Sequence, residues 1–98
     1  NKLKRKIKIA CLGITFKPNV EDLRESPALK IVETLLKEDF DLLICEPNLK
    51  KYIGFKIYDF LDAIKNADLI VPLVAHNEFK DFDFSSFRVL DFCGIDDK

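Results

Sequence analysis

A chain of 98 residues and 11.3 kDa is long enough for one domain with a buried core and too short for two. Apolar residues make up 48% of the chain and charged residues 34%, which excludes the charge-rich, apolar-poor composition of disordered proteins. The 16 basic and 17 acidic side chains nearly cancel, so the net charge of -1 predicts no general attraction to nucleic acid or to an anionic membrane.

The cysteines and the hydropathy indicate the cellular compartment. Cys11, Cys45 and Cys93 lie far apart in apolar runs, without CxxC spacing, as buried and reduced thiols do. We see no signal peptide and no apolar stretch near the ~18 residues needed to cross a bilayer. We therefore expect a cytoplasmic protein, with no thiol activated as a nucleophile and no metal site.

The first half of the chain predicts two strands and one helix. The almost unbroken apolar run over 7–15 is typical of a central strand that is covered on both faces. A polar loop over 16–25 follows, and Ser26 is placed to cap a helix over 27–38 that has a proline at its first position. The short apolar run over 40–45 predicts the second strand.

The second half repeats this alternation with shorter elements. Asp59 is placed to cap a helix, and Pro72, which cannot donate to a strand ladder, is expected near the end of its strand. The expected elements are an edge strand over 56–58, a helix over 59–67, a strand over 69–74, a short helix or turn over 77–82 and a last strand over 87–92.

Alternation of strands with helices predicts the fold class. We expect a single α/β domain over 1–98, Rossmann-like, in which a parallel sheet forms the middle of three layers and carries helices on both faces. Such sheets bind ligands outside the carboxyl ends of their strands.

The loop over 16–25 is the strongest candidate for a binding site. It follows the first strand, leads into a helix N-terminus and carries two cations, Lys17 and Arg24. Free N–H groups and the helix dipole favour an anion there, and Arg24 could bind a phosphate with two hydrogen bonds. The alternative is a surface loop in which Lys17 or Arg24 pairs with a neighbouring acid, and the residues alone leave both readings open.

Two other polar residues follow apolar strands. The dinucleotide-binding GxGxxG pattern is missing, since Gly13 is the one glycine after the first strand. Glu46 ends the second strand, where many dinucleotide folds keep a ribose-binding acid, but without the glycines a turn-forming role is favoured. His76 follows the 69–74 strand, and ligand hydrogen bonding and helix capping both remain open for it.

The sequence around the first loop resembles a known family. The string KIACLGITFKPNVEDLRESPA over 8–28 is similar to the opening of the C-terminal domain of the UDP-glucose/GDP-mannose dehydrogenase family, and within it to the UDP-N-acetyl-D-mannosamine dehydrogenases. Further similarities are the EPN string at 46–48, the ADLIV string at 67–71, His76 followed by Phe79 and Lys80, and the VLD string at 89–91.

The resemblance implies a function for the whole enzyme. Such enzymes oxidise the C6 alcohol of a nucleotide sugar to a carboxylate in two NAD-dependent steps, here UDP-N-acetylmannosamine to its uronate for surface polysaccharide. It implies that Phe16 and Lys17 face the UDP-sugar and that Arg24 reaches toward NAD. It also implies that an N-terminal NAD domain, the catalytic cysteine and a central helical region lie outside this chain, which alone should be inactive. The central region would drive assembly into a homodimer or a larger oligomer.

Three positions depart from the family pattern. Cys93 stands where a basic residue is common, Ala75 stands where an acid commonly precedes the histidine, and Pro72 is unusual in its strand. Two alternatives therefore stay open: a dehydrogenase of UDP-glucose or another nucleotide sugar, and a non-catalytic α/β interaction module.

Overall fold

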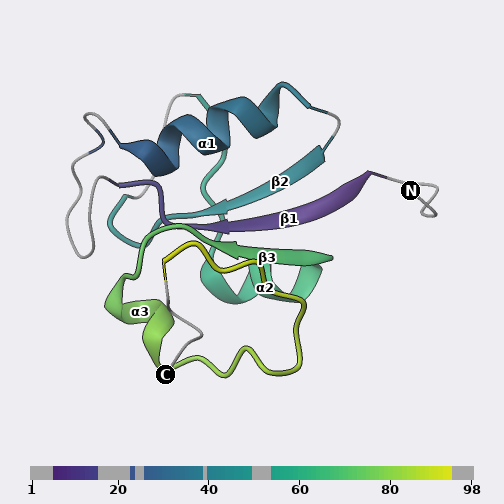
Figure 1. The fold of residues 1–98 in the computed structure, drawn as a ribbon, viewed down its shortest axis with the longest axis vertical. Helices are drawn as coiled ribbons and strands as arrows, with labels where there is room; N and C mark the ends of the chain where they lie inside the picture. Colours follow the sequence, from purple (N-terminus) through teal and green to yellow (C-terminus); the bar gives the residue numbers. More distant parts are fainter. Residues whose placement is uncertain (1–5, 16–22, 24–25, 39, 50–53, 94–98) are drawn as a thin grey trace.

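The computed structural model describes residues 6–15, 23, 26–38, 40–49 and 54–93. Its sheet contains three parallel strands in the order β2-β1-β3 (Figure 1). The strands are β1 (Ile7–Leu12), β2 (Phe40–Cys45) and β3 (Leu69–Pro72), and the helices are α1 (Pro27–Leu36), α2 (Phe60–Asn66) and α3 (Asn77–Lys80). Because β1 is central, its carboxyl end lies between the ends of the other two strands.

Helices cover both faces of this sheet. Along β1, Ile9 and Cys11 pack in a core cluster with Val32 of α1, while Ala10 and Leu12 point to the opposite face and pack in a cluster with α2 and α3. Figure 1 shows α1 on one side of the sheet and the other two helices on the other side. The predicted three-layer α/β arrangement is confirmed.

Two strands end earlier than the hydropathy predicts. The chain leaves β1 at Gly13, whose φ of 94° lies in the region that favours glycine, and the Gly13 N–H donates to the Cys45 carbonyl at 2.8 Å. The strand predicted over 69–74 ends at Pro72, as the proline suggested, and the N–H groups of the next two residues both donate to the Leu12 carbonyl, at 2.9 and 3.2 Å.

The edge strand predicted over 56–58 and the last strand predicted over 87–92 are each reduced to a single bridge. Ile57 pairs with Ile44, and Val89 pairs with Ile70, both in parallel orientation. Between β3 and the segment over 87–92, the Phe92 N–H donates to the Pro72 carbonyl at 3.1 Å, but Pro72 has no N–H to donate to that segment. The ladder expected over 87–92 is interrupted at this point, so the prediction of a full strand was wrong.

Helix α1 covers only part of its face of the sheet. Ala28 and Val32 are buried, whereas Ile31, which lies between them in the sequence, remains 38% exposed. Beside it lies an apolar groove of about 290 Å³ whose outer wall includes Leu90 and Phe92, 51% and 60% exposed. Within the described residues, the β3 half of this face therefore carries no covering helix.

Candidate functional site

The predicted site residues Phe16, Lys17 and Arg24 lie outside the described residues, but both ends of their loop are described. The Ser26 hydroxyl donates to the Ile14 carbonyl at 2.7 Å and to the Thr15 carbonyl at 3.1 Å. The same oxygen accepts the Leu29 N–H at 3.0 Å, which confirms Ser26 as the N-cap of α1. The two ends of the loop are thus bound to each other.

A buried polar network occupies the carboxyl ends of the three strands. It is centred on Glu46, which follows β2, and His76, which lies beyond β3, and these residues are 1% and 0% exposed. Glu46 Oε1 accepts the Ile14 N–H at 2.8 Å and lies 2.9 Å from His76 Nε2. Glu46 Oε2 accepts the Asn48 backbone N–H at 2.9 Å and the Asn48 amide at 3.3 Å. Every carboxylate oxygen therefore has two donors.

The geometry fixes the proton on the His76 ring. A carboxylate only accepts hydrogen bonds, so Nε2 carries the hydrogen that is directed at Glu46. Nδ1 lies 3.2 Å from the Asn48 amide nitrogen, a donor, and so it accepts. Thr15 Oγ1 lies 3.2 Å from Nε2 and connects the start of the loop to the ring.

The surroundings of Glu46 favour its ionised form. Burial would raise the pKa of this carboxyl, but the hydrogen bonds from His76 and from the backbone N–H groups of Ile14 and Asn48 outweigh burial and lower the pKa below its ordinary value. A carboxylate that is ionised, buried and satisfied within the protein does not present an oxygen to a ribose. The turn-forming role is confirmed, since the Leu49 N–H donates to the Glu46 carbonyl at 3.1 Å.

Of the two roles left open for His76, the structure does not support helix capping by the side chain. The residue stands at the N-cap position of α3, yet its side chain makes no capping hydrogen bond, because the ring is directed inward to Glu46 and Asn48. Asp59, at the N-cap position of α2, likewise makes no side-chain cap.

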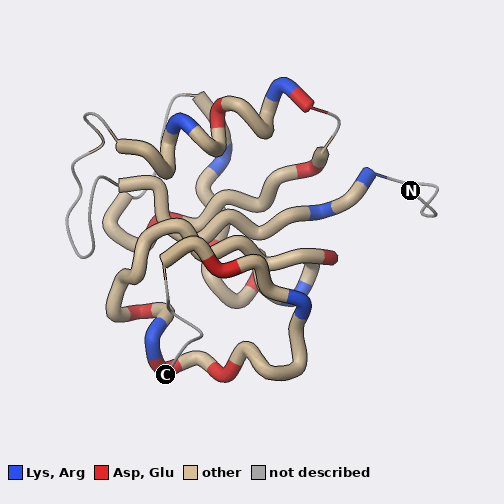
Figure 2. Tube along the Cα trace, viewed as in Figure 1, with Lys and Arg blue, Asp and Glu red and all other residues tan. Residues whose placement is uncertain are grey.

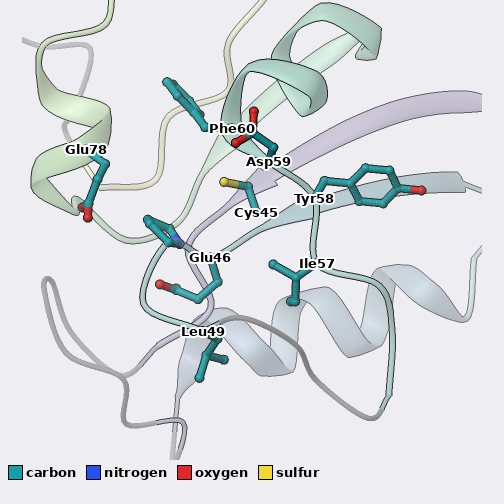
Figure 3. A pocket seen from close by; sticks show the side chains of 9 residues that line it. Cys45, Glu46, Leu49, Ile57, Tyr58, Asp59, Phe60 and Glu78 are labelled. Carbon is teal, nitrogen blue, oxygen red and sulfur yellow. The ribbon is translucent and has the colours of Figure 1, made fainter.

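A pocket of about 460 Å³ lies beside the end of β2. Figure 3 shows Glu46, Leu49, Ile57 and Phe60 around it, with the Tyr58 hydroxyl pointing away from it. Besides Glu46, Asp59 and Glu78 line this pocket. Among the described residues that line the pocket, three are acidic and none is basic, so this part of the lining disfavours a phosphate.

Cys11 and Cys45 are buried thiols, as expected, whereas the expectation that Cys93 is also buried was wrong. Burial raises the pKa of Cys11 to about 12, and burial together with the nearby acids Glu46, Asp59 and Glu78 does the same for Cys45. Cys93 is half-buried, and its N–H donates to Asp91 Oδ1 at 3.0 Å. The expectation that neither Cys11 nor Cys45 is an activated nucleophile agrees with this environment.

Among the described residues, neither the charges nor the possible metal ligands indicate a second site. Figure 2 shows basic and acidic positions intermixed along the described chain. Across those same residues, no group of three or more His, Cys, Asp or Glu side chains could hold a metal ion. In the part of the chain that the structure describes, no helix combines the length and hydropathy needed to span a membrane.

The sequence pointed to Glu46 and His76 separately but did not predict their contact with each other. Both Glu46 and His76 were noted as polar residues after apolar strands, and the carboxyl ends of parallel strands meet at one edge. That placement was the available signal for their contact. Thr15 was missed because it lies inside an apolar run and was included in the strand.

Known proteins with similar sequences are nucleotide-sugar dehydrogenases. The UDP-N-acetyl-D-mannosamine dehydrogenase of Campylobacter jejuni is 41% identical over 106 aligned positions, covering 94% of this chain and 26% of the relative. The enzyme of the same name from Escherichia coli K12 is 45% identical over 80 positions, covering 76% of this chain and 19% of the relative. The chain thus spans only about a fifth to a quarter of the length of these relatives.

Solved structures agree with this similarity. The UDP-N-acetyl-mannosamine dehydrogenase from S. aureus superposes with a TM-score of 0.69 at 36% identity, over 84% of this chain and 20% of that one. A UDP-D-ManNAc dehydrogenase from Pyrococcus horikoshii superposes with a TM-score of 0.78 at 28% identity, over 92% of this chain and 22% of that one. The family model described as "UDP-glucose/GDP-mannose dehydrogenase family, UDP binding domain" matches residues 10–91. The chain therefore belongs to the UDP-glucose/GDP-mannose dehydrogenase family and corresponds to its UDP-binding domain.

Proposed function

We propose that residues 1–98 are the C-terminal UDP-binding domain of a longer, cytoplasmic, NAD-dependent dehydrogenase that converts UDP-N-acetylmannosamine to its uronate for surface polysaccharide synthesis. The observation that carries this proposal is the match of residues 10–91 to the UDP-binding domain model. The two relatives described above, both UDP-N-acetyl-D-mannosamine dehydrogenases by name, support the choice of sugar. The domain alone is inactive, since the proposal places the catalytic cysteine elsewhere in the enzyme.

The proposed nucleotide contacts lie on the loop between Thr15 and Ser26. Phe16 and Lys17 bind the UDP-sugar, and Arg24 reaches toward NAD. Two observations support this loop: it ends at the capped N-terminus of the ten-residue helix α1, and the described lining of the pocket beside β2 is acidic. We therefore propose that the diphosphate binds near Lys17 and the positive end of the α1 dipole.

The residues described here do not fit an NAD site of the usual Rossmann kind. The first strand is not followed by GxGxxG, and the acid at the end of β2, Glu46, is buried and bound within the protein. We therefore place most of the NAD site in an N-terminal domain outside this chain. A central helical region would join the two domains and form a homodimer.

The decisive test is the kinetics of the full-length enzyme, followed by NADH formation with UDP-N-acetylmannosamine. Lys17→Ala should raise the KM for the UDP-sugar about tenfold or more, the scale of one lost charge-assisted hydrogen bond. Arg24→Ala should raise the KM for NAD instead. Lys37→Ala removes the same charge at the opposite end of α1 and should change neither constant.

The same assay distinguishes the proposed function from a dehydrogenase of another sugar and from a non-catalytic module. Faster turnover of UDP-glucose or another nucleotide sugar would replace the proposed sugar and keep the enzyme class. Absence of NADH formation with any UDP-sugar would favour the non-catalytic module. For the 98-residue chain alone we expect weak UDP binding, with amide NMR shifts confined to 16–28, because an open face must offset the entropy of association with few contacts.

A further inference from the structure

We propose that Glu46 and His76 are positioning residues that hold the start of the nucleotide-binding loop. The proposal rests on the function proposed above and goes beyond it, because neither side chain touches the nucleotide. Instead the pair fixes the backbone from which Phe16 and Lys17 extend.

Glu46 and His76 connect the chain segments that follow the three strands, at the carboxyl ends of those strands. Glu46 follows β2 and accepts the N–H of Ile14, two residues beyond β1. His76 lies beyond β3 and contacts Thr15 Oγ1. Strand register is already set by six residue pairs between β1 and β2 and four between β1 and β3. The network adds contacts to the two residues that precede the loop, where the sheet no longer constrains the chain.

The other end of the loop is attached to the same two residues. The Ser26 hydroxyl donates to the carbonyls of Ile14 and Thr15 while it caps α1. Ile14 is thus held by its N–H through Glu46 and by its carbonyl through Ser26. A shift of the Glu46 carboxylate would move both the loop start and the point to which the helix N-terminus is bound.

Burial makes the pair sensitive to loss of one partner. A carboxylate with 1% exposure depends on its donors, and loss of His76 Nε2–H leaves Oε1 with the Ile14 N–H alone among the contacts described above. The carboxylate would then reorient or admit water, and the Ile14 N–H would follow or lose its acceptor.

The test uses the full-length dehydrogenase with three variants. His76→Leu fills the space without a donor, whereas His76→Gln places an amide nitrogen the same number of bonds from Cβ as Nε2. Thr15→Val removes one hydroxyl and keeps the shape, which gives a milder variant if His76→Leu does not fold. Thr34→Val is the matched control, because its hydroxyl donates to the Lys30 carbonyl on the exposed side of α1.

We expect His76→Leu to raise the KM for the UDP-sugar about tenfold, with kcat changed less than about threefold, because the nucleotide is bound away from the reacting carbon. His76→Gln should restore KM to within about threefold of wild type, and Thr15→Val should raise it about threefold. Thr34→Val should leave KM unchanged.

Each result has one meaning for the proposal. Wild-type KM in both His76→Leu and Thr15→Val would overturn the positioning role while leaving the proposed function intact. Equal KM increases in His76→Leu and His76→Gln, with equal losses of thermal stability, would also overturn it, since they indicate packing alone. A wild-type enzyme without UDP-sugar activity would overturn the proposed function itself, and the positioning role with it.

Discussion

Replacement of Gly13 by alanine tests how the chain turns out of β1. At a φ of 94°, an L-residue is strained, which costs about 1–2 kcal/mol. The added Cβ would lie 2.7 Å from Val74 Cβ and 3.2 Å from the Val74 backbone nitrogen. Because part of that contact is backbone, the segment that follows β3 must move, and overpacking of this kind costs about 1–3 kcal/mol. Gly13→Ala should therefore reduce the free energy of unfolding by about 3 kcal/mol.

Urea unfolding of the 98-residue chain measures this loss, and thermal unfolding should show a fall in Tm of about 12–24 °C. Gly54→Ala is the control, because Gly54 is exposed and Gly13 is the one described glycine with positive φ. The control should remain within about 0.5 kcal/mol of wild type. If Gly13→Ala lost no more than the control, the left-handed turn and the close approach of Val74 would both be refuted.

Three further outcomes follow from the site. Ser26→Ala should lose about 1–2 kcal/mol of unfolding free energy, and Ser26→Asp should lose more although aspartate is a good N-cap, because it cannot donate to the Ile14 carbonyl. The stabilisation from Glu46 is present above its unfolded pKa and should disappear as pH falls through the lower folded pKa, so Glu46→Gln should flatten the acid limb of a stability–pH curve. In native protein at pH 8, iodoacetamide should leave Cys11 and Cys45 unmodified by mass spectrometry, whereas urea should expose both.

The sequence predicted the layers of the fold better than the lengths of its strands. Hydropathy and the spacing of apolar residues located the three strands and the three helices that the structure describes. Ser26 was predicted as a helix cap because capping depends on neighbouring residues alone. The last strand, predicted over 87–92, was overestimated because hydropathy does not show that Pro72 of the neighbouring strand interrupts the ladder. Glu46 and His76 are 30 residues apart, so their pairing depends on strand order, which a single sequence does not specify.

The positions that serve a dinucleotide in many Rossmann folds serve the protein itself in this chain. There, glycine after the first strand lets a pyrophosphate approach the backbone, and an acid after the second binds a ribose. Here, Gly13 instead lets Val74 approach, and the Glu46 carboxylate binds His76 and Ile14. Because both positions are used within the protein, the phosphate needs other residues, as in the proposed site on the loop between Thr15 and Ser26. The same fold is thereby suited to a mononucleotide diphosphate, since the chemistry of a site depends on the residues at the strand ends more than on the sheet that carries them.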